Sequence, residues 1–526
     1  MIRNFSKFLL VFLIIFAWIF SGWPRIGSFP PHIQQVRALT VGPSFPTSGV
    51  NDTSIGTTVW TAPGNVTVSD NTRASVSLVK NSGVSQAIKA TGFGFAIPAD
   101  AQIDGITVEW ETSEGGLAAA GGIKDNAVRL VRAGTIEATD LSNTTFWVAP
   151  ASEAFVTYGG ATNLWGAAWT AADINNANFG AAISAKNVKV SGGGANEDAD
   201  VDSVRITVNY TLPTYNQSAY RLFNNLDSTD VGTALAAQDI AAILGSTGAA
   251  FRLRMLLHIG AAQLNASAQN FKLQFAQQSG TCDTAFSGES YADVTAATVI
   301  AYNNNATPAD GASLTANAND PTHGADTIVN QTYEELNNFT NSVAAIPSAQ
   351  DGKWDFSLKD NGATASTAYC FRVVKSDGTV LDTYTQIPQI TTAAAAVVSV
   401  SVSDGAVTYG TIPANSTKST CTSELNDAQT LTNDGNVTEN FNIRGQNSAN
   451  WTLAAATGSD QYVQKFLNGT CSIFSGGTAL TTSTQSFATG VAVSGTATLN
   501  LQINTPNPSS VYTQQSVDVT ITAVQQ

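Results

Sequence analysis

Residues 203–211 read SVRITVNYT, and apolar and polar side chains alternate through this stretch without a break. Val204, Ile206, Val208 and Tyr210 fall on one face of an extended chain, while the intervening polar residues fall on the other. Alternation with a period of two is typical of an antiparallel strand that buries one face and exposes the other. The stretch therefore predicts β-structure with one face against a core.

The same alternation recurs along the whole chain, and turn signals such as Asp404 followed by Gly405 separate the repeats. No helical crossover pattern recurs between these segments, which argues against a parallel α/β sheet. Short stretches at 234–244 and 332–338 have helical periodicity and are predicted as helices on a β framework. We predict an all-β fold of tandem antiparallel β-sandwich domains after an N-terminal signal helix. Further predicted strands lie at 106–110, 251–259, 271–275, 354–358, 398–402 and 517–521.

The N-terminus has the pattern of a secretory signal. Arg3 and Lys7 precede an uncharged apolar run, FLLVFLIIFAWIFSGW at 8–23. This run is shorter than the roughly 20 residues that a membrane-spanning helix needs. Val36 and Ala38 supply small residues at positions −3 and −1 of a cleavage site. We predict cleavage after Ala38, with an uncleaved membrane anchor as the alternative, and in both cases a secreted or cell-surface chain.

The composition limits the classes of partner. Charged residues make up 12% of the chain, and the formal charge is −15. The segment before the proposed cleavage site holds four basic residues and no acidic one, so cleavage changes the charge to −19. Such a chain repels nucleic acid and anionic lipid. We therefore expect no nucleic-acid partner, and membrane attachment only through an uncleaved leader.

Strand endings and a linker predict three domains after the leader at 1–38. A first sandwich at 39–212 would end just before Pro213, a second would span 213–392, and a third would span 397–526 after the linker TTAAAA. Each is long enough for a sandwich core, which uses about 100 residues.

Four cysteines fall in pairs within the later two domains, Cys282 with Cys370 and Cys421 with Cys471. An even number of cysteines in an exported chain predicts disulfides within each domain, and buried free thiols are the alternative.

Several blocks resemble known kinds of protein. Residues 21–38 (SGWPRIGSFPPHIQQVRA) and 368–392 (AYCFRVVKSDGTVLDTYTQIPQITT) resemble uncharacterised exported proteins of reduced-genome, uncultivated bacteria. Residues 93–110 (FGFAIPADAQIDGITVEW) are similar to jelly-roll-like modules of surface and phage-like proteins, and residues 433–445 (NDGNVTENFNIRG) resemble a bacterial immunoglobulin-like sandwich. The resemblance implies a jelly-roll-like first domain, an immunoglobulin-like third domain and a surface location. It transfers no catalytic residue.

An acidic segment precedes the alternating stretch. Carboxylates at Glu197, Asp198, Asp200 and Asp202 could converge on a hard cation, so they are candidate ligands for a structural calcium ion, but a solvated acidic loop is the interpretation that we favour. The three aspartates share the parity of Val204, and a continuous strand would direct them into the core at high cost. We expect the pleat to break at or before Asp202, leaving the aspartates in a loop or at a sheet edge.

Aromatic residues gather at Trp147, Tyr158, Trp165 and Trp169. Exposed rings of this kind can stack on sugars, so these residues are the candidate ligand-binding platform for glycans. We favour the alternative, in which they fill the core of the first sandwich.

His258 and His323 are the histidines that follow the proposed cleavage site. Either could bind a metal or accept a proton, but no HExxH, GxSxG or Walker A motif accompanies them, and we expect structural roles for both.

We therefore predict no catalytic residue and no enzyme. The predicted function is an exported, non-catalytic surface protein for adhesion, for binding glycans or cell-surface proteins, or for envelope structure. The alternative is an exported polysaccharide hydrolase with accessory binding modules. A hydrolase would need two opposed carboxylates in a cleft, with perturbed pKa values.

Overall fold

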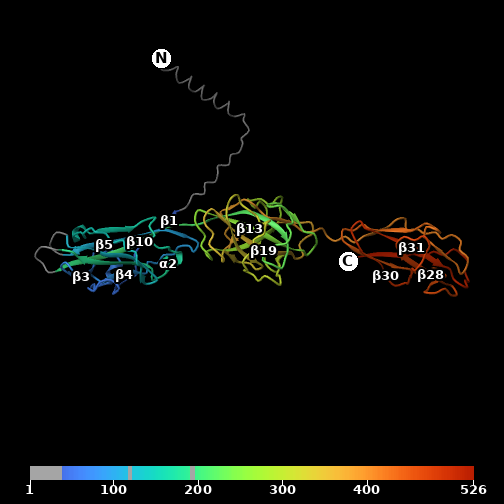
Figure 1. Cartoon of the computed structure of the whole chain (residues 1–526), viewed down its shortest axis with the longest axis horizontal. Helices are drawn as coiled ribbons and strands as arrows, with labels where there is room; N and C mark the ends of the chain where they lie inside the picture. Colours follow the sequence, from blue (N-terminus) through green and yellow to red (C-terminus); the bar gives the residue numbers. More distant parts are fainter. Residues whose placement is uncertain (1–37, 116–120, 190–195) are drawn as a thin grey trace, which may run out of the picture. The chain divides into compact units, whose positions relative to one another are not determined.

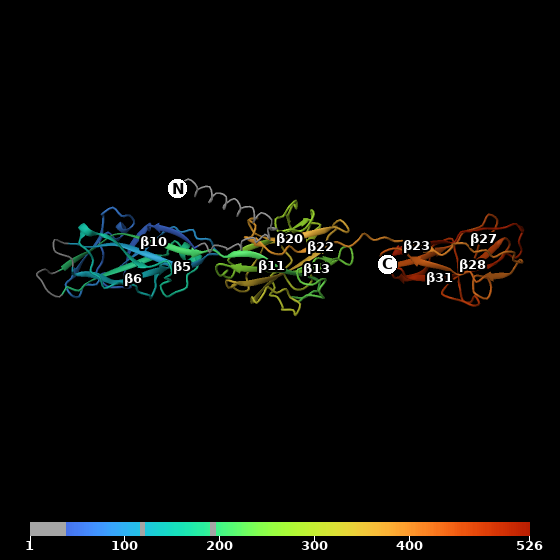
Figure 2. The same cartoon turned by 90° about the horizontal axis from the view of Figure 1, so that it is seen from above.

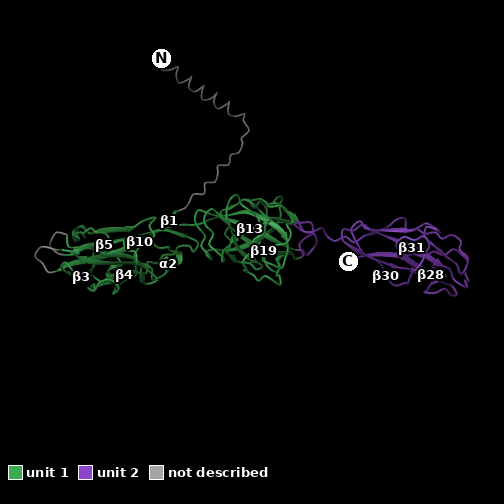
Figure 3. Ribbon diagram, viewed as in Figure 1, with its two compact units in different colours: residues 1–242, 250–361, 368–390 green, residues 243–249, 362–367, 391–526 purple. Residues whose placement is uncertain are grey.

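A computed structural model describes residues 38–115, 121–189 and 196–526. The predicted signal helix lies outside the described residues. Within the described part, no helix is long and apolar enough to cross a membrane. The chain divides into two compact units (Figure 3), which comprise residues 1–242, 250–361 and 368–390, and residues 243–249, 362–367 and 391–526.

The first pair of sheets in unit 1 is built from strands between residues 38 and 211. One sheet contains, in order, β1 (Ala38–Ser44), β10 (Asn196–Thr211), β5 (Gln102–Gly115) and β8 (Ala154–Gly159), with β3 (Ala74–Val79) also on β10. The other contains β2 (Ser48–Asp52), β4 (Ala87–Thr91), β9 (Gly180–Asn187), β6 (Ile123–Arg132) and β7 (Thr135–Ile136). The short helix α2 (Ala171–Asn175) precedes β9.

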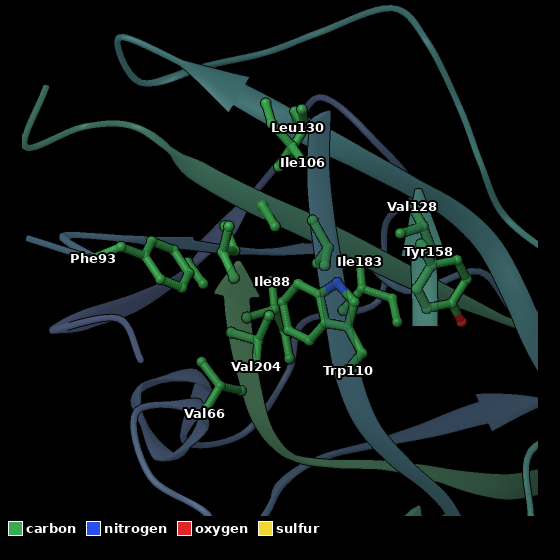
Figure 4. Packing of buried hydrophobic residues seen from close by; sticks show 14 of the residues in the cluster. Val66, Ile88, Phe93, Ile106, Trp110, Val128, Leu130, Tyr158, Ile183 and Val204 are labelled. Atoms are coloured by element: carbon green, nitrogen blue, oxygen red, sulfur yellow. The ribbon is translucent and has the colours of Figure 1, made fainter. Parts of the chain in front are cut away.

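Apolar side chains of these strands form a large buried cluster, and Ala87, Val131 and Ala182 form a smaller separate one. Figure 4 shows the indole of Trp110 from β5 among Val204 of β10, Ile88 of β4 and Ile183 of β9. The alternating face of 203–211 is therefore the core face, as the sequence predicts.

Strand β10 runs through the acidic segment because a β-bulge interrupts its pairing with β5. Val201 faces Thr112 and Ser203 faces Glu111, so Asp202 is an extra residue without a partner position. Before the bulge the odd-numbered residues point inward, so Ala199 and Val201 are buried. After the bulge the even-numbered residues point inward, so Val204 and Ile206 are buried. The predicted break at Asp202 is correct. The expectation of a loop or sheet edge is wrong, because the bulge keeps the aspartates within a paired strand.

The second pair of sheets draws its strands from residues 214–391. One sheet runs β16 (Ile300–Tyr302), β19 (Gln350–Asp360), β13 (Ala250–Gly260), β11 (Thr214–Asn224) and β21 (Thr383–Tyr384), with β17 (Ile328–Glu334) on β19. The facing sheet, visible in Figure 2 at β20 and β22, runs β12 (Ala242–Ile243), β22 (Gln389–Thr391), β20 (Ala368–Lys375), β14 (Asn270–Gln277) and β15 (Ala292–Asp293), with β18 (Phe339–Thr340) on β14.

Most ladders are antiparallel, but β17 runs parallel to β19 and β21 runs parallel to β11. The helices expected at 234–244 and 332–338 are wrong, since no helix forms in either of these described segments and β17 occupies 332–334.

Unit 2 contains a third pair of sheets. Its larger sheet orders β23 (Val400–Val402), β25 (Gln429–Asn433), β31 (Thr496–Asn504), β28 (Gln461–Asn468) and β27 (Thr452–Leu453), with β24 (Thr417–Ser419) on β31 and β29 (Thr478–Ala479) on β28. The three-stranded sheet is β30 (Gln485–Val491), β26 (Glu439–Arg444) and β32 (Thr520–Gln525). The all-β prediction is confirmed. The division into three domains stays a prediction, because the first two pairs of sheets belong to one compact unit.

Both predicted disulfides are present. Cys282 and Cys370 are bonded with their Cα atoms 5.5 Å apart, and Cys421 and Cys471 with theirs 5.2 Å apart. The free-thiol alternative is therefore excluded for all four cysteines.

Candidate metal centre

Four side chains that can each supply one metal ligand converge in the second sandwich of unit 1: His258, His323, Asp326 and Asp351. Their ligand atoms all lie within 4.8 Å of one another. Over residues 38–115, 121–189 and 196–526 this is the single group of three or more histidine, cysteine, aspartate or glutamate side chains with such spacing.

Two neighbouring strands position one half of this centre. His258 of β13 and Asp351 of β19 are directly opposite in an antiparallel ladder, and Figure 1 shows these two strands side by side. Asp351 is fully buried, and the Ser218 hydroxyl from β11 donates a hydrogen bond of 2.6 Å to its Oδ1. Its other oxygen, Oδ2, therefore remains for the two histidines.

A turn in the long connection from β16 to β17 positions the other half. The Asp326 amide donates to the His323 carbonyl at 3.0 Å, which brings the two side chains to the same side of the turn. Immediately afterwards β17 begins with Ile328 paired to Asp351. The parallel pairing of β17 with β19 thus places the turn beside His258 and Asp351.

The contacts between imidazoles and carboxylates form a closed ring. The Nδ1 atom of His323 lies 3.1 Å from Oδ2 of both Asp326 and Asp351. The Nδ1 atom of His258 lies 3.1 Å from the same oxygen of Asp326 and 3.4 Å from that of Asp351. A ring nitrogen carries at most one hydrogen, which cannot point well at two carboxylates together. A cation at the centre can meet all four atoms.

The electrostatics of the centre favour positive charge. The hydrogen bond to Asp351 raises the pKa of His258, and burial opposes this only in part. Burial by itself would raise the pKa of Asp351, but hydrogen bonds from His258 and Ser218 bring it below its ordinary value. The contact between His258 and Asp351 therefore favours a positive charge between them, either a proton or a metal cation.

A buried layer of charge adjoins the centre on the same face of β13 and β19. Asp355 lies 2.7 Å from Nη2 of Arg252 and 2.8 Å from Nε of Arg254, and all three side chains are fully buried. Asp320, in the same long connection as His323, pairs with both Arg254 and the buried Lys353. The connection at 303–327 therefore lies over a charged sheet face that is shielded from water.

The predicted calcium ligands do not converge. Glu197 pairs with Lys189, Asp200 accepts a hydrogen bond from the Ser75 hydroxyl, and Asp198 lies opposite Gly115. Asp202, on the bulge, is almost fully buried, and its Oδ1 has no hydrogen-bond partner. Among the described residues these carboxylates form no group with ligand spacing, and calcium binding here stays a prediction.

The predicted aromatic platform is buried, which corrects the ligand-binding role given to these residues. Trp147, Tyr158, Trp165 and Trp169 all belong to the core cluster of the first sandwich. The polar hydrogens of these side chains are hydrogen-bonded within the fold. Trp147 and Tyr158 both donate to Asp125, Trp165 donates to the Ile106 carbonyl, and Trp169 donates to the Leu164 carbonyl. The core-packing alternative is the correct one.

Comparisons with known proteins leave the chain without a family. No protein-family model and no curated protein matches it. Among solved structures, the native conformation of E. coli alpha-2-macroglobulin aligns with 93% of this chain at 10% identity and a TM-score of 0.16. The chain spans 32% of that protein, and a similarity this low assigns neither fold nor function.

Sequence reasoning identified His258 and His323 separately and missed their convergence with Asp326 and Asp351. The available signal was the spacing of His323 and Asp326, which is short enough for one turn to present both. The contact with His258 depends on the fold of a connection that has no helix or strand between 303 and 327.

Proposed function

We propose that the chain is an exported, non-catalytic surface protein whose β-sandwiches serve adhesion, the binding of glycans or cell-surface proteins, or envelope structure. The observation that carries this proposal is the pair of disulfides, Cys282–Cys370 and Cys421–Cys471, within β-sheet modules. Disulfides form and persist in oxidising compartments outside the cytosol.

Composition and resemblance give further support. The low content of charged residues and the apolar segment at 8–23 agree with export. The resemblance of 21–38 and 368–392 to exported proteins of uncultivated bacteria remains part of the proposal. Since the four aromatic residues of the candidate platform are buried, we expect any ligand to bind to exposed loops.

The experiment combines binding and hydrolysis on one preparation of residues 39–526, made in an oxidising compartment. A glycan array and binding to intact cells measure recognition, and the release of new reducing ends from polysaccharides measures hydrolysis. We expect binding that is lost when the protein is reduced and unfolded, and no release of reducing ends. Release above that of the unfolded control would instead favour the polysaccharide hydrolase.

A further inference from the structure

We propose that His258, His323, Asp326 and Asp351 bind one zinc ion, which ties the connection at 303–327 to the strands beneath it. The four ligand atoms would be the two Nδ1 nitrogens and the two Oδ2 oxygens that already face one another. Imidazole nitrogen and carboxylate oxygen are both common zinc ligands in proteins.

The spacing of these atoms agrees with tetrahedral coordination. Bonds of about 2.0–2.1 Å from zinc to nitrogen or oxygen place tetrahedral ligand atoms about 3.3–3.4 Å apart. The four nitrogen-to-oxygen distances in this centre are 3.1, 3.1, 3.1 and 3.4 Å. The nitrogen-to-oxygen pairs would therefore need to move by only a few tenths of an ångström, and all four ligand atoms already lie within 4.8 Å of one another.

Ligand type distinguishes zinc from calcium and magnesium. Calcium takes six to eight oxygen ligands and magnesium an octahedron of oxygens, so neither suits a centre that is half imidazole. Two carboxylates with two neutral imidazoles leave two negative charges, which a divalent cation balances. Zinc takes four ligands of this kind without a further geometric requirement.

The surroundings hold the ligands in place and leave a route for the ion. Ser218 fixes the orientation of Asp351 through Oδ1, a role that such outer partners play at metal sites. The side chains of His258, Asp326 and His323 remain 25%, 26% and 35% exposed. One side of the centre is thus rigid and buried, and the other is accessible to a metal ion.

The position of the centre indicates what the ion does. The connection at 303–327 is long and lacks regular structure, which is uncommon in a compact domain. It covers Arg254 and Lys353, which are buried and pair with Asp320 of this connection. If the connection opened, Lys353 would lose its carboxylate partner Asp320, Arg254 would keep only the carboxylate of Asp355, and both would lose their shielding from water. A zinc ion bound by two residues from the connection and two from the strands would hold it closed.

The test uses residues 39–526 purified without a histidine tag, stripped with a chelator and titrated with zinc chloride alone. Calorimetry gives stoichiometry and affinity, and hydrogen exchange reports the order of 303–327. We choose His323→Ala and Asp326→Asn because both lie in the connection, where a change should spare the strand core. Asp377→Asn, in an exposed turn of the same compact unit, is the matched control.

We expect one zinc per chain, slower exchange in 303–327 on binding, and an affinity that falls about tenfold or more in both connection variants. The Asp377→Asn protein should bind as the unmodified chain does. The proposal would be overturned if Asp326→Asn and Asp377→Asn bound zinc with equal affinity. It would also be overturned if zinc did not bind stoichiometrically, or if calcium or magnesium bound in place of zinc. Far-ultraviolet circular dichroism of each variant confirms that it is folded.

Discussion

Glu334 ends strand β17 with a carboxyl group that is almost fully buried. Burial raises its pKa to about 8, although a hydrogen bond from the Thr332 hydroxyl opposes the rise. The folded protein therefore holds this side chain protonated at pH values where the unfolded chain ionises it.

The first prediction concerns the pH dependence that Glu334 confers. A group with a raised folded pKa stabilises the protein fully below its unfolded value of 4.5, and this stabilisation is lost as pH rises through about 8. Relative to Glu334→Gln, the free energy of unfolding of the unmodified protein should fall by about 1.4 kcal/mol per pH unit across this range. Urea unfolding of both proteins at pH 4.5, 6 and 8 measures the difference. A constant difference would show that Glu334 titrates normally.

The second prediction follows from the burial of the tryptophans. Trp165 is 2% exposed, and its indole nitrogen is hydrogen-bonded in the core, whereas Phe146 nearby in sequence is 45% exposed. Trp165→Ala should lower the stability of unit 1 by about 3–5 kcal/mol, and Phe146→Ala should cost much less. Denaturant unfolding compares the two variants. Equal and small losses of stability in the two variants would instead favour an exposed aromatic platform.

Single residues divide into those whose surroundings can be predicted and those whose surroundings cannot. The parity of Val204, Ile206 and Val208 predicts their burial, because alternation within a strand is a local property. Trp165 and Trp169 have no such pattern around them, so both a core and a surface role were open. The candidate metal centre depends on a contact between strand β13 and a turn distant in sequence, which no local pattern encodes.

At the scale of elements, the bulge in β10 gives the third prediction. Without Asp202 the strand would alternate regularly, with Ala199, Val201, Val204 and Ile206 all facing inward. Deletion of Asp202 should therefore keep the fold, and it removes a buried carboxylate that lacks one hydrogen-bond partner. We expect a melting temperature at pH 7 that equals or exceeds that of the unmodified protein.

Deletion of Thr207 from the same strand is the control. It would reverse the facing of every residue on one side of the deletion, and the protein should fail to fold. Circular dichroism melting of both deletions is sufficient. If deletion of Asp202 were as damaging as deletion of Thr207, the bulge would be required for the fold.

Strand β17 shows where local pattern is misleading at this scale. Residues 332–338 contain good helix formers, yet β17 pairs with β19, and the ring of Tyr333 packs on Arg252 at 4.5 Å. Tertiary packing therefore outweighs propensity. The strands at 106–110 and 251–259 were predictable because burial of one face imposes a pattern on the sequence itself.

For the molecule as a whole, the fourth prediction concerns the disulfide of unit 2. Cys421 and Cys471 are separated by 50 residues, and in the chain-entropy model closing a loop of this size stabilises the fold by about 4 kcal/mol. Replacing both by serine should lower the stability of unit 2 by about this amount. Hydrogen exchange should locate the loss in residues 391–526, with Cys282 and Cys370 replaced in a parallel control. Loss of amide protection mainly in residues 38–211 would contradict the assignment of the Cys421–Cys471 disulfide to the stability of unit 2.

Sandwich architecture and cysteine pairing were predictable at this scale because alternation and an even cysteine count are properties of the whole sequence. The grouping of the first two pairs of sheets into one compact unit could not be predicted. It depends on contacts between residues far apart in sequence, such as the hydrogen bond of 2.8 Å from the Tyr215 hydroxyl to Asp100.

The central claim is that this disulfide-bonded protein functions outside the cytoplasm. Intact mass spectrometry tests it on the protein recovered from cell fractions of its native host, after alkylation without reduction. We predict a chain of residues 39–526 with no alkyl group in the extracytoplasmic fraction. A chain that retains residues 1–38 there, still unalkylated, would correct the cleavage site and leave export intact. A chain found in the cytoplasmic fraction with all four cysteines alkylated would contradict the account.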